Sequence, residues 1–254
     1  MTNLKLFLNP QTGMSGDMMV GALVDLGAGT SKIKSAMEVA GQFLGEARVR
    51  IYPRKKIDTL ATRVDVFFEP FSHQLHREEV NKALREAVKR LGLPEAYAQF
   101  AQESLSILLD AEEDAHREIP GFTNSSHLHE AADILMDILG TTVALEELGF
   151  LPGKNIYCLE PVYVGGGKVS FSHGTFPVPA PATRRILERY KIPYRKGPVE
   201  VELLTPTGAT LLARMVAGFL AREKKEGLVV RKRAYGAGAM DLDVPNLLEV
   251  IVAQ

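Results

Sequence analysis

The sequence has 254 residues, of which 46% are hydrophobic and 24% charged, a composition typical of one large globular domain or two small ones. Its 30 lysines and arginines nearly balance 31 aspartates and glutamates, so the basic surface of a nucleic-acid-binding protein is missing. No segment approaches the roughly 20 apolar residues of a membrane span, and the N-terminus does not resemble a signal peptide. The single cysteine, Cys158, excludes an internal disulfide and a thiolate metal cluster. We expect a soluble cytoplasmic protein without nucleic-acid or membrane partners, with homo-oligomer formation left open.

The N-terminal part predicts a strand, two helices and a β-hairpin. Residues 4–8 form the strand, and apolar residues at helical spacing over 15–27 and 30–45 predict the helices, with Ser15 and either Thr30 or Ser31 as N-caps. Two alternating runs rich in Val, Ile and Phe within 46–69 predict antiparallel strands. Pro53 places the first of these strands at a sheet edge or a bulge.

A helical segment follows, from about residue 74 to 149, with three amphipathic stretches. The last third predicts two further helices and several strands: helices over 180–190 and 205–219, strands within 154–174, 198–204, 227–238 and 246–254. Mixed sheet elements at both ends of the chain with a central helical segment favour an α+β fold over a regular βαβ series. We expect residues 1–254 to form a single region.

The segment from 126 to 137, which reads SHLHEAADILMD, is a candidate metal site. Successive helix residues turn by about 100°, so His129, Asp133 and Asp137 stack on one face of a helix, with Glu130 beside them. Imidazole and carboxylate groups suit a divalent ion such as nickel, zinc or manganese, and His127 would extend the set.

A structural interpretation of the same segment is also open. An amphipathic helix needs a polar face, and acidic residues near its N-terminus interact favourably with the helix dipole. The polar arc, however, contains no lysine or arginine to neutralise its three carboxylates. The spacing alone therefore leaves both a metal site and a solvated face possible.

Four glycine-bearing loops could cradle a ligand. Ser15, Gly16 and Asp17 open a helix whose free N–H groups could receive a phosphate or carboxylate. The second loop carries three glycines followed by Lys168, then His173 and a proline-rich run that allows a cis bond. The third loop is TPTG, from Thr205 to Gly208. The fourth loop is AYGAGAMDLDVPN, over 234–246. Hairpin turns, helix caps and surface connections explain the same loops equally well.

Several blocks, in this order along the chain, resemble one family: GMSGDMMVGALVDLGA, HLHE, DILMDILGTTVALEELG, HGTFPVPAPAT, ELLTPTGA and YGAGAMDLDVPN. The series is similar to the LarC family, the nickel-insertion proteins of the pathway that makes the nickel-pincer nucleotide cofactor of lactate racemase. The similarity covers nearly the whole chain.

This resemblance implies insertion of nickel into a pyridinium bis-thiocarboxylate mononucleotide, with the help of CTP and a divalent metal such as manganese or magnesium. It implies metal ligands at the matching positions His127, His129, Glu130, Asp133, Asp137 and His173. The glycine loops would receive the mononucleotide, through Ser15, Gly16, Asp17, Gly166, Gly167, Lys168, Thr205 and Thr207.

The sequence also departs from the family pattern. Asn9 stands where the family usually has an acid, and the segment between HLHE and Asp133 is slightly shorter than the family's. The family's C-terminal region, to which CTP binding is attributed, has no counterpart in this sequence. The alternatives are a non-catalytic nickel chaperone or a subunit that needs a partner chain with that region, and a metal-dependent phosphate-ester hydrolase on the same scaffold; whether the chain is an enzyme is open.

Overall fold

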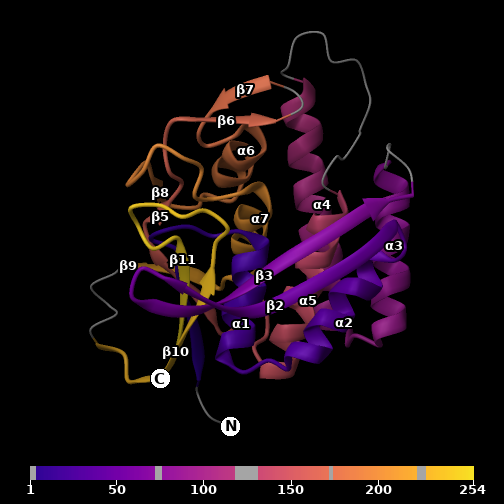
Figure 1. The fold of residues 1–254 in the computed structure, drawn as a ribbon, viewed down its shortest axis with the longest axis horizontal. Helices are drawn as coiled ribbons and strands as arrows, with labels where there is room; N and C mark the ends of the chain where they lie inside the picture. The colour runs from indigo at the N-terminus through magenta and orange to yellow at the C-terminus, as the bar shows by residue number, and fades with distance from the viewer. Residues whose placement is uncertain (1–3, 72–75, 118–130, 172–173, 222–226) are drawn as a thin grey trace.

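The computed structural model describes residues 4–71, 76–117, 131–171, 174–221 and 227–254 (Figure 1). These residues form seven α-helices, a mixed seven-stranded sheet and two small two-stranded sheets. The α+β class and the central helical segment are therefore confirmed. None of the helices described is both long and apolar enough to cross a membrane.

The large sheet is built from the two ends of the chain. Its strands lie in the order β2-β3-β10-β11-β1-β4-β9. Their bounds are β1 Lys5–Asn9, β2 Gly45–Lys56, β3 Thr59–Pro70, β4 Ile156–Glu160, β9 Gly218–Ala221, β10 Val230–Ala237 and β11 Leu247–Ala253. Strand β1 pairs antiparallel with β11 and parallel with β4, so strands far apart in the sequence share the centre of the sheet.

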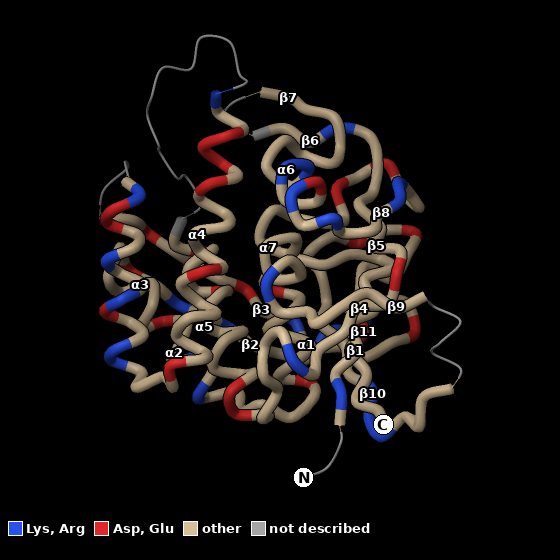
Figure 2. Tube along the Cα trace, turned by 180° about the vertical axis from the view of Figure 1, so that it is seen from behind, with Lys and Arg blue, Asp and Glu red and all other residues tan. Residues whose placement is uncertain are grey.

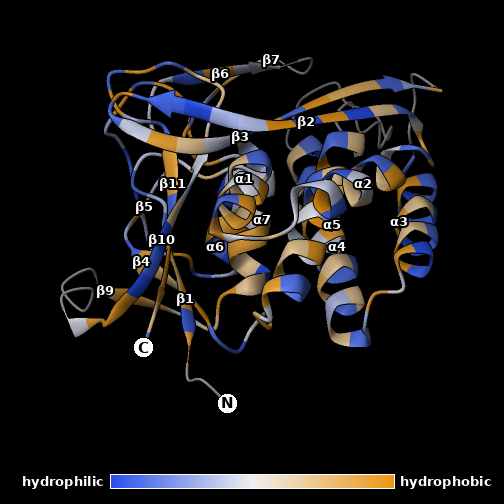
Figure 3. Cartoon of the chain, turned by 60° about the horizontal axis from the view of Figure 1, so that its bottom comes forward, coloured by the Kyte–Doolittle hydropathy of each residue, from blue (hydrophilic) through white to orange (hydrophobic). Residues whose placement is uncertain are grey.

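Strands β2 and β3 form a long hairpin that leaves the sheet and runs across the helices (Figures 1 and 3). The hairpin joins the sheet through a short parallel contact, in which Thr62 and Arg63 lie opposite Gly236 and Ala237. Strand β2 is the edge strand, as Pro53 predicted. This short contact places Arg63 where hairpin, sheet and helices meet.

The helices gather on one side of the sheet, with α3 farthest from it (Figures 1 and 3). Their bounds are α1 Gly16–Leu26, α2 Thr30–Gly41, α3 Arg77–Leu91, α4 Glu95–Arg117, α5 Ala131–Leu148, α6 Pro181–Arg189 and α7 Pro206–Met215. Helix α5 packs against α1, α2 and α4, and most of its apolar side chains are fully buried. Acidic and basic residues are interspersed along helix α3, whereas the charged residues of α4 are acidic except for the arginine at its end (Figure 2).

Three local predictions are wrong. Segment 198–204 is not a strand, because its backbone groups bond to neighbouring loops: Leu203 N–H donates to Val164 O at 3.0 Å. The helix predicted over 205–219 ends at Met215, and its last residues form β9. Helix α2 already begins at Thr30, so its N-cap is Gly29 and not Thr30 or Ser31. The small sheets pair β5 Val162–Tyr163 with β8 Tyr194–Arg195, and β6 Lys168–Phe171 with β7 Gly174–Pro177.

Helix α1 lies directly on the backbone of β10. A Cβ atom added at Gly236 would overlap the carbonyl oxygen of Met18 in α1. Both partners are backbone, so neither side can move aside cheaply. This contact fixes the height of α1 above the sheet.

We predict that Gly236→Ala lowers the free energy of unfolding by roughly 1–3 kcal/mol, because an overpacked core must shift its backbone. Gly218→Ala is the matched control, since a Cβ at that strand glycine meets no atom within 4 Å. Urea unfolding at neutral pH measures both variants. An equal loss of stability in the two would contradict this account of the α1 contact.

Candidate functional site

A cavity of about 310 Å³ lies where the first turns of α1, α5 and α7 approach strand β3. It is lined by Ser15, Gly16, Asp17, Arg63, Val64, Val66, Glu112, Asp133, Ile134, Asp137, Glu202, Thr205, Pro206 and Thr207. Seven of these residues were candidate ligands on the sequence alone: Ser15, Gly16, Asp17, Asp133, Asp137, Thr205 and Thr207. The fold therefore brings together three segments that are far apart in the chain.

Backbone hydrogen bonds join the glycine-bearing loops around this cavity. Met14 N–H donates to Leu203 O at 2.8 Å, and Thr205 N–H donates to Met14 O at 3.2 Å. The Asn246 amide donates to Thr12 O at 3.2 Å, which adds the fourth loop. The second loop joins the third through the bond from Leu203 to the carbonyl of Val164. The four loops therefore adjoin one another.

The two helix starts are completed differently. Thr205 caps α7 as expected, since its hydroxyl accepts from the Gly208 N–H at 3.1 Å. Ser15 occupies the N-cap position of α1 but makes no side-chain cap bond. Its hydroxyl donates to the Asp17 carboxylate instead. The N–H groups at the start of α1 are thus left to other acceptors.

Asp17 and Arg63 form an ion pair at the wall of the cavity. Arg63 Nη1 donates to Asp17 Oδ2 and also to Ala237 O, at 3.2 Å for the latter, while its Nε donates to Asp65 at 2.9 Å. Burial acts to lower the pKa of Arg63, but the charges of Asp17 and Asp65 and their hydrogen bonds outweigh it and raise that pKa above its ordinary value. Arg63 is therefore a fixed cation with about 10% of its side chain exposed.

Asp137 is the buried carboxyl group of the cavity. The residue is 9% exposed, and its Oδ1 has no hydrogen-bond partner among the described residues. Burial is the main cause that raises its pKa well above the ordinary value, and the charges of Asp17 and Asp133 add to this. The charge of Arg63 and a hydrogen bond from the Asp17 N–H act in the opposite direction without cancelling it. For Asp137, the interpretation as a solvated helix face is wrong.

Gly16 explains how this carboxyl group reaches the start of α1. A Cβ atom at position 16 would overlap the Asp137 carboxyl group. The absence of a side chain lets Asp137 lie against the first turn of α1, where its neighbour donates a backbone N–H to it. The contact therefore requires glycine at this position.

The cavity wall carries five carboxyl groups and a single guanidinium among the described residues: Asp17, Glu112, Asp133, Asp137, Glu202 and Arg63. No local pattern singles out Glu112, which lies in an ordinary amphipathic helix, or Arg63, which alternates in a strand as an exposed residue would. Glu202 precedes the TPTG turn and could have been found from that turn. Carboxylate oxygens suit a divalent cation, and the first turns of α1 and α7 suit an anion.

No three His, Cys, Asp or Glu side chains within the described ranges come close enough together to hold a metal ion as they stand. Four of the candidate ligands, His127, His129, Glu130 and His173, lie outside the described residues. The first three precede α5 directly in the sequence, and Asp133 stands in its first turn. Their part in a metal site stays a prediction.

The second glycine loop borders the cavity without lining it. Gly166 is buried, and its N–H donates to Val201 O at 3.2 Å. Gly167 and Lys168 are exposed. A cis bond precedes Pro179, as the proline-rich run allowed. Ligand binding by Gly166, Gly167 and Lys168 stays a prediction.

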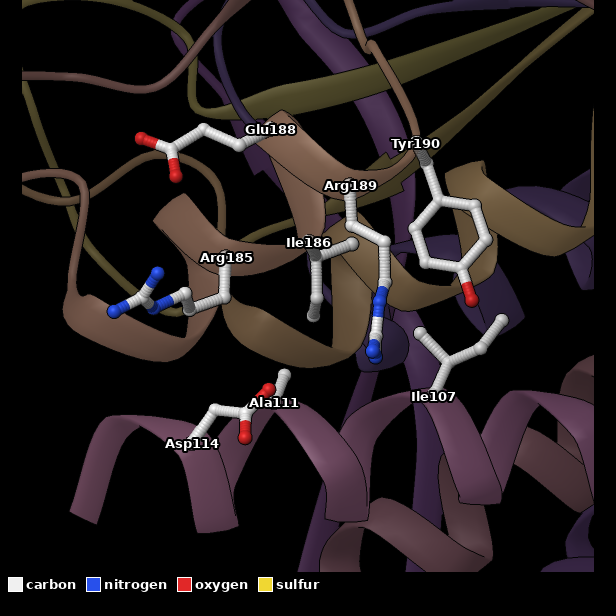
Figure 4. A pocket seen from close by; sticks show the side chains of 8 residues that line it. All are labelled: Ile107, Ala111, Asp114, Arg185, Ile186, Glu188, Arg189 and Tyr190. Carbon is white, nitrogen blue, oxygen red and sulfur yellow. The ribbon is translucent and has the colours of Figure 1, made fainter. Parts of the chain in front are cut away.

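A second cavity, of about 330 Å³, lies between α4 and α6 (Figure 4). Arg189 extends from α6 toward α4, on which Asp114 stands, whereas Arg185 extends along α6 (Figure 4). None of the residues singled out from the sequence lines it, and its charges are of both signs. Cys158 is not a candidate metal ligand either. Burial, assisted by the charge of Glu160, raises the pKa of its thiol, and metals bind the thiolate.

Comparison with known proteins gives a consistent result. The sequence profile described as "Nickel insertion protein" matches residues 6–254. A candidate nickel insertion protein of Methanothrix thermoacetophila is 37% identical over 252 residues, which cover 98% of this chain and 59% of the relative. The pyridinium-3,5-bisthiocarboxylic acid mononucleotide nickel insertion protein of Thermotoga sp. is 36% identical, over 96% of this chain and 60% of its own length. The protein of that name from Staphylococcus epidermidis is 32% identical, over 97% and 58%.

The chain thus spans somewhat less than two thirds of the length of these relatives. No solved structure matches it significantly.

We predict that the pKa of Asp137 makes stability fall as pH rises. Below about pH 4 the carboxyl group is protonated in both the folded and the unfolded chain. Above that pH the unfolded chain releases the proton while the folded protein retains it, so the free energy of unfolding falls by up to about 1.4 kcal/mol per pH unit until the raised pKa is passed. Asp137→Asn should remove this slope.

Urea unfolding of the wild type and Asp137→Asn at several pH values between 4 and 8 measures the difference. Asp58→Asn is the control, because the Asp58 side chain is 95% exposed in the hairpin turn. The wild type should lose stability relative to Asp137→Asn as pH rises, and a constant difference would contradict the raised pKa.

Proposed function

The chain belongs to the nickel insertion protein family, and on this premise we propose that it binds nickel and a pyridinium mononucleotide in the cavity between α1, α5 and α7. Its work there is the insertion of the metal into the nucleotide or the delivery of the metal for that step. The proposal draws its substrate from the names of the Thermotoga and Staphylococcus relatives. Nickel is the cargo in this reaction. We also propose that the work is done in the cytoplasm.

The observation that supports a metal role best is the buried Oδ1 of Asp137. A buried polar atom without a hydrogen-bond partner destabilises the folded protein, and so does a buried carboxyl group close to two other acids. A divalent cation removes both penalties when it replaces the proton. Asp133 and Asp17 line the same cavity and can supply further oxygen ligands.

Nickel also favours imidazole nitrogen. We propose that His127, His129 and Glu130, which precede α5 in the sequence, complete the ligand set together with His173. Carboxylates on α5 would then hold the ion from the cavity wall, and the imidazoles would supply its nitrogen ligands. Metal transfer needs ligands of moderate strength, and a mixed set of carboxylate and imidazole provides them.

The mononucleotide carries a phosphate and further acidic groups. We propose that the first turns of α1 and α7, with Ser15 and Thr207 at the wall, receive its phosphate through backbone N–H groups. Gly166, Gly167 and Lys168, which adjoin the third loop, would contact a more distant part of the same ligand.

A CTP-dependent step with manganese or magnesium needs a different site. A triphosphate is ordinarily held by several basic groups, whereas the described wall of this cavity carries Arg63 alone. We propose that CTP and its metal bind in another region or on a partner chain. This chain would then act as the nickel-handling part of the system.

We predict that the wild type binds nickel with an affinity on the order of 100-fold higher than Asp137→Asn, because the variant replaces an anionic ligand by a neutral amide. Isothermal titration of the metal-free protein with nickel chloride measures this. His129→Ala combined with Asp133→Ala should lose affinity similarly, whereas Asp58→Asn should bind as the wild type does.

Two outcomes would sink parts of the proposal. Equal nickel affinity in the wild type and Asp137→Asn would remove the metal from this cavity. Turnover of a simple phosphate ester with manganese, at a rate that nickel does not improve, would favour the hydrolase alternative over nickel handling.

A further inference from the structure

Arg63 is the one basic side chain in the described wall of the nickel-binding cavity, and its surroundings constrain it unusually. Five carboxyl groups share that wall with it, yet its hydrogen bonds go to only two acids, Asp17 and Asp65, and to the carbonyl of Ala237. Its two acidic partners differ in their placement. Asp17 lines the cavity, whereas Asp65 does not.

Asp65 holds the guanidinium from outside the cavity. It accepts from Arg63 Nε at 2.9 Å, from Arg50 at 2.7 Å and from the Tyr52 hydroxyl at 3.0 Å. Burial acts to raise the pKa of Asp65, but these hydrogen bonds and the charge of Arg63 lower it below the ordinary value. Asp65 therefore stays ionised and keeps Arg63 in position, with Ala237 O as a second fixed acceptor.

Asp17 differs from Asp65 in facing the cavity. It stands in the first turn of α1, beside the buried carboxyl group of Asp137, and 21% of its side chain is exposed. A divalent cation bound by Asp137 attracts the Asp17 carboxylate as well, since both acids line one wall. Arg63 cannot follow, because Asp65 and Ala237 hold it on the other side.

We propose that nickel binding draws Asp17 away from Arg63 and thereby turns Arg63 into the binding group for an anion of the nucleotide. This inference rests on the proposed function and deepens it, because it names the residue that couples the two ligands. Before either ligand binds, Asp17 accepts a hydrogen bond from the Nη1 N–H groups of Arg63. With the metal bound, those N–H groups face a cavity that also contains the first turns of α1 and α7, and a phosphate or carboxylate takes the place of Asp17.

The partner exchange makes the two ligands cooperative. Nickel takes Asp17 away from Arg63, and the anion takes Arg63 away from Asp17. Each ligand thus removes the group that competes with the other ligand, so each should tighten the binding of the other by the same factor. The buried Oδ1 of Asp137, which has no hydrogen-bond partner, is an independent observation that favours a cation at this wall, since the helix starts alone would indicate only an anion.

The test is nickel titration calorimetry at pH 7 with and without ribose 5-phosphate, a phosphate monoester that isolates the anionic group. In the wild type, ribose 5-phosphate should raise the nickel affinity by about tenfold, within the usual range of such couplings. Arg63→Met should bind nickel alone at least as tightly, because Asp17 then has no competing cation, while the response to ribose 5-phosphate disappears. Arg54→Met, which removes another guanidinium of the same hairpin from its pair with Asp241, should keep the full response.

Asp17→Asn provides a second arm with a gain of function, which a misfolded variant could not show. Loss of the carboxylate should leave Arg63 available without metal, so ribose 5-phosphate should bind the nickel-free variant about tenfold more tightly than it binds the nickel-free wild type. An undiminished response in Arg63→Met, or no gain in Asp17→Asn, overturns the inference. Nickel binding that ribose 5-phosphate leaves unchanged also overturns it while the proposed function stands, whereas the absence of nickel binding by the wild type refutes both.

Discussion

The site depends on one constraint, the close packing of helix α1 against the backbone of strand β10. Gly236 lets the helix backbone lie on β10, and Gly16 lets the Asp137 carboxyl group lie against its first turn. Helix α1 is thereby wedged between the sheet and α5. Once it is fixed in that place, Asp17 must face Arg63 at the junction of the hairpin and the sheet. The site is thus a consequence of backbone packing rather than of a flexible loop.

The charged groups around the start of α1 lower the stability of the folded protein. A buried carboxyl group near two other acids raises the free energy of the folded state, and apolar packing would avoid that penalty. The fold offsets part of it with the Asp17 N–H and the charge of Arg63. Binding sites are where a fold tolerates such an arrangement, because the ligand supplies the missing charge.

The sequence allowed prediction of those features that local signals determine. The Thr205 cap and the edge position of β2 each follow from a few neighbouring residues. The period of α5 placed Asp133 and Asp137 on one face, but their depth depends on how α1 docks, which no local pattern encodes. Arg63 was missed for the same reason, since its partner Asp17 is 46 residues away. The prediction of a strand at 198–204 was wrong because backbone groups of this segment bond to neighbouring loops.

In the proposed function, the cavity accepts both a metal and a polyanionic nucleotide, and these two ligands make opposite demands on its charge. Carboxylates that attract the cation repel the anion, and an arginine that attracts the anion repels the cation. The ion pair between Asp17 and Arg63 resolves this conflict before ligands bind, because neither charge is then buried alone. If one ligand alone breaks the ion pair, the other charged side chain is left buried without a partner, which raises the free energy of the complex. If both ligands bind, each side chain has a new partner. On the proposed partner exchange, the energetic penalty of an unpaired buried charge would make the cavity favour metal and nucleotide together over either one alone.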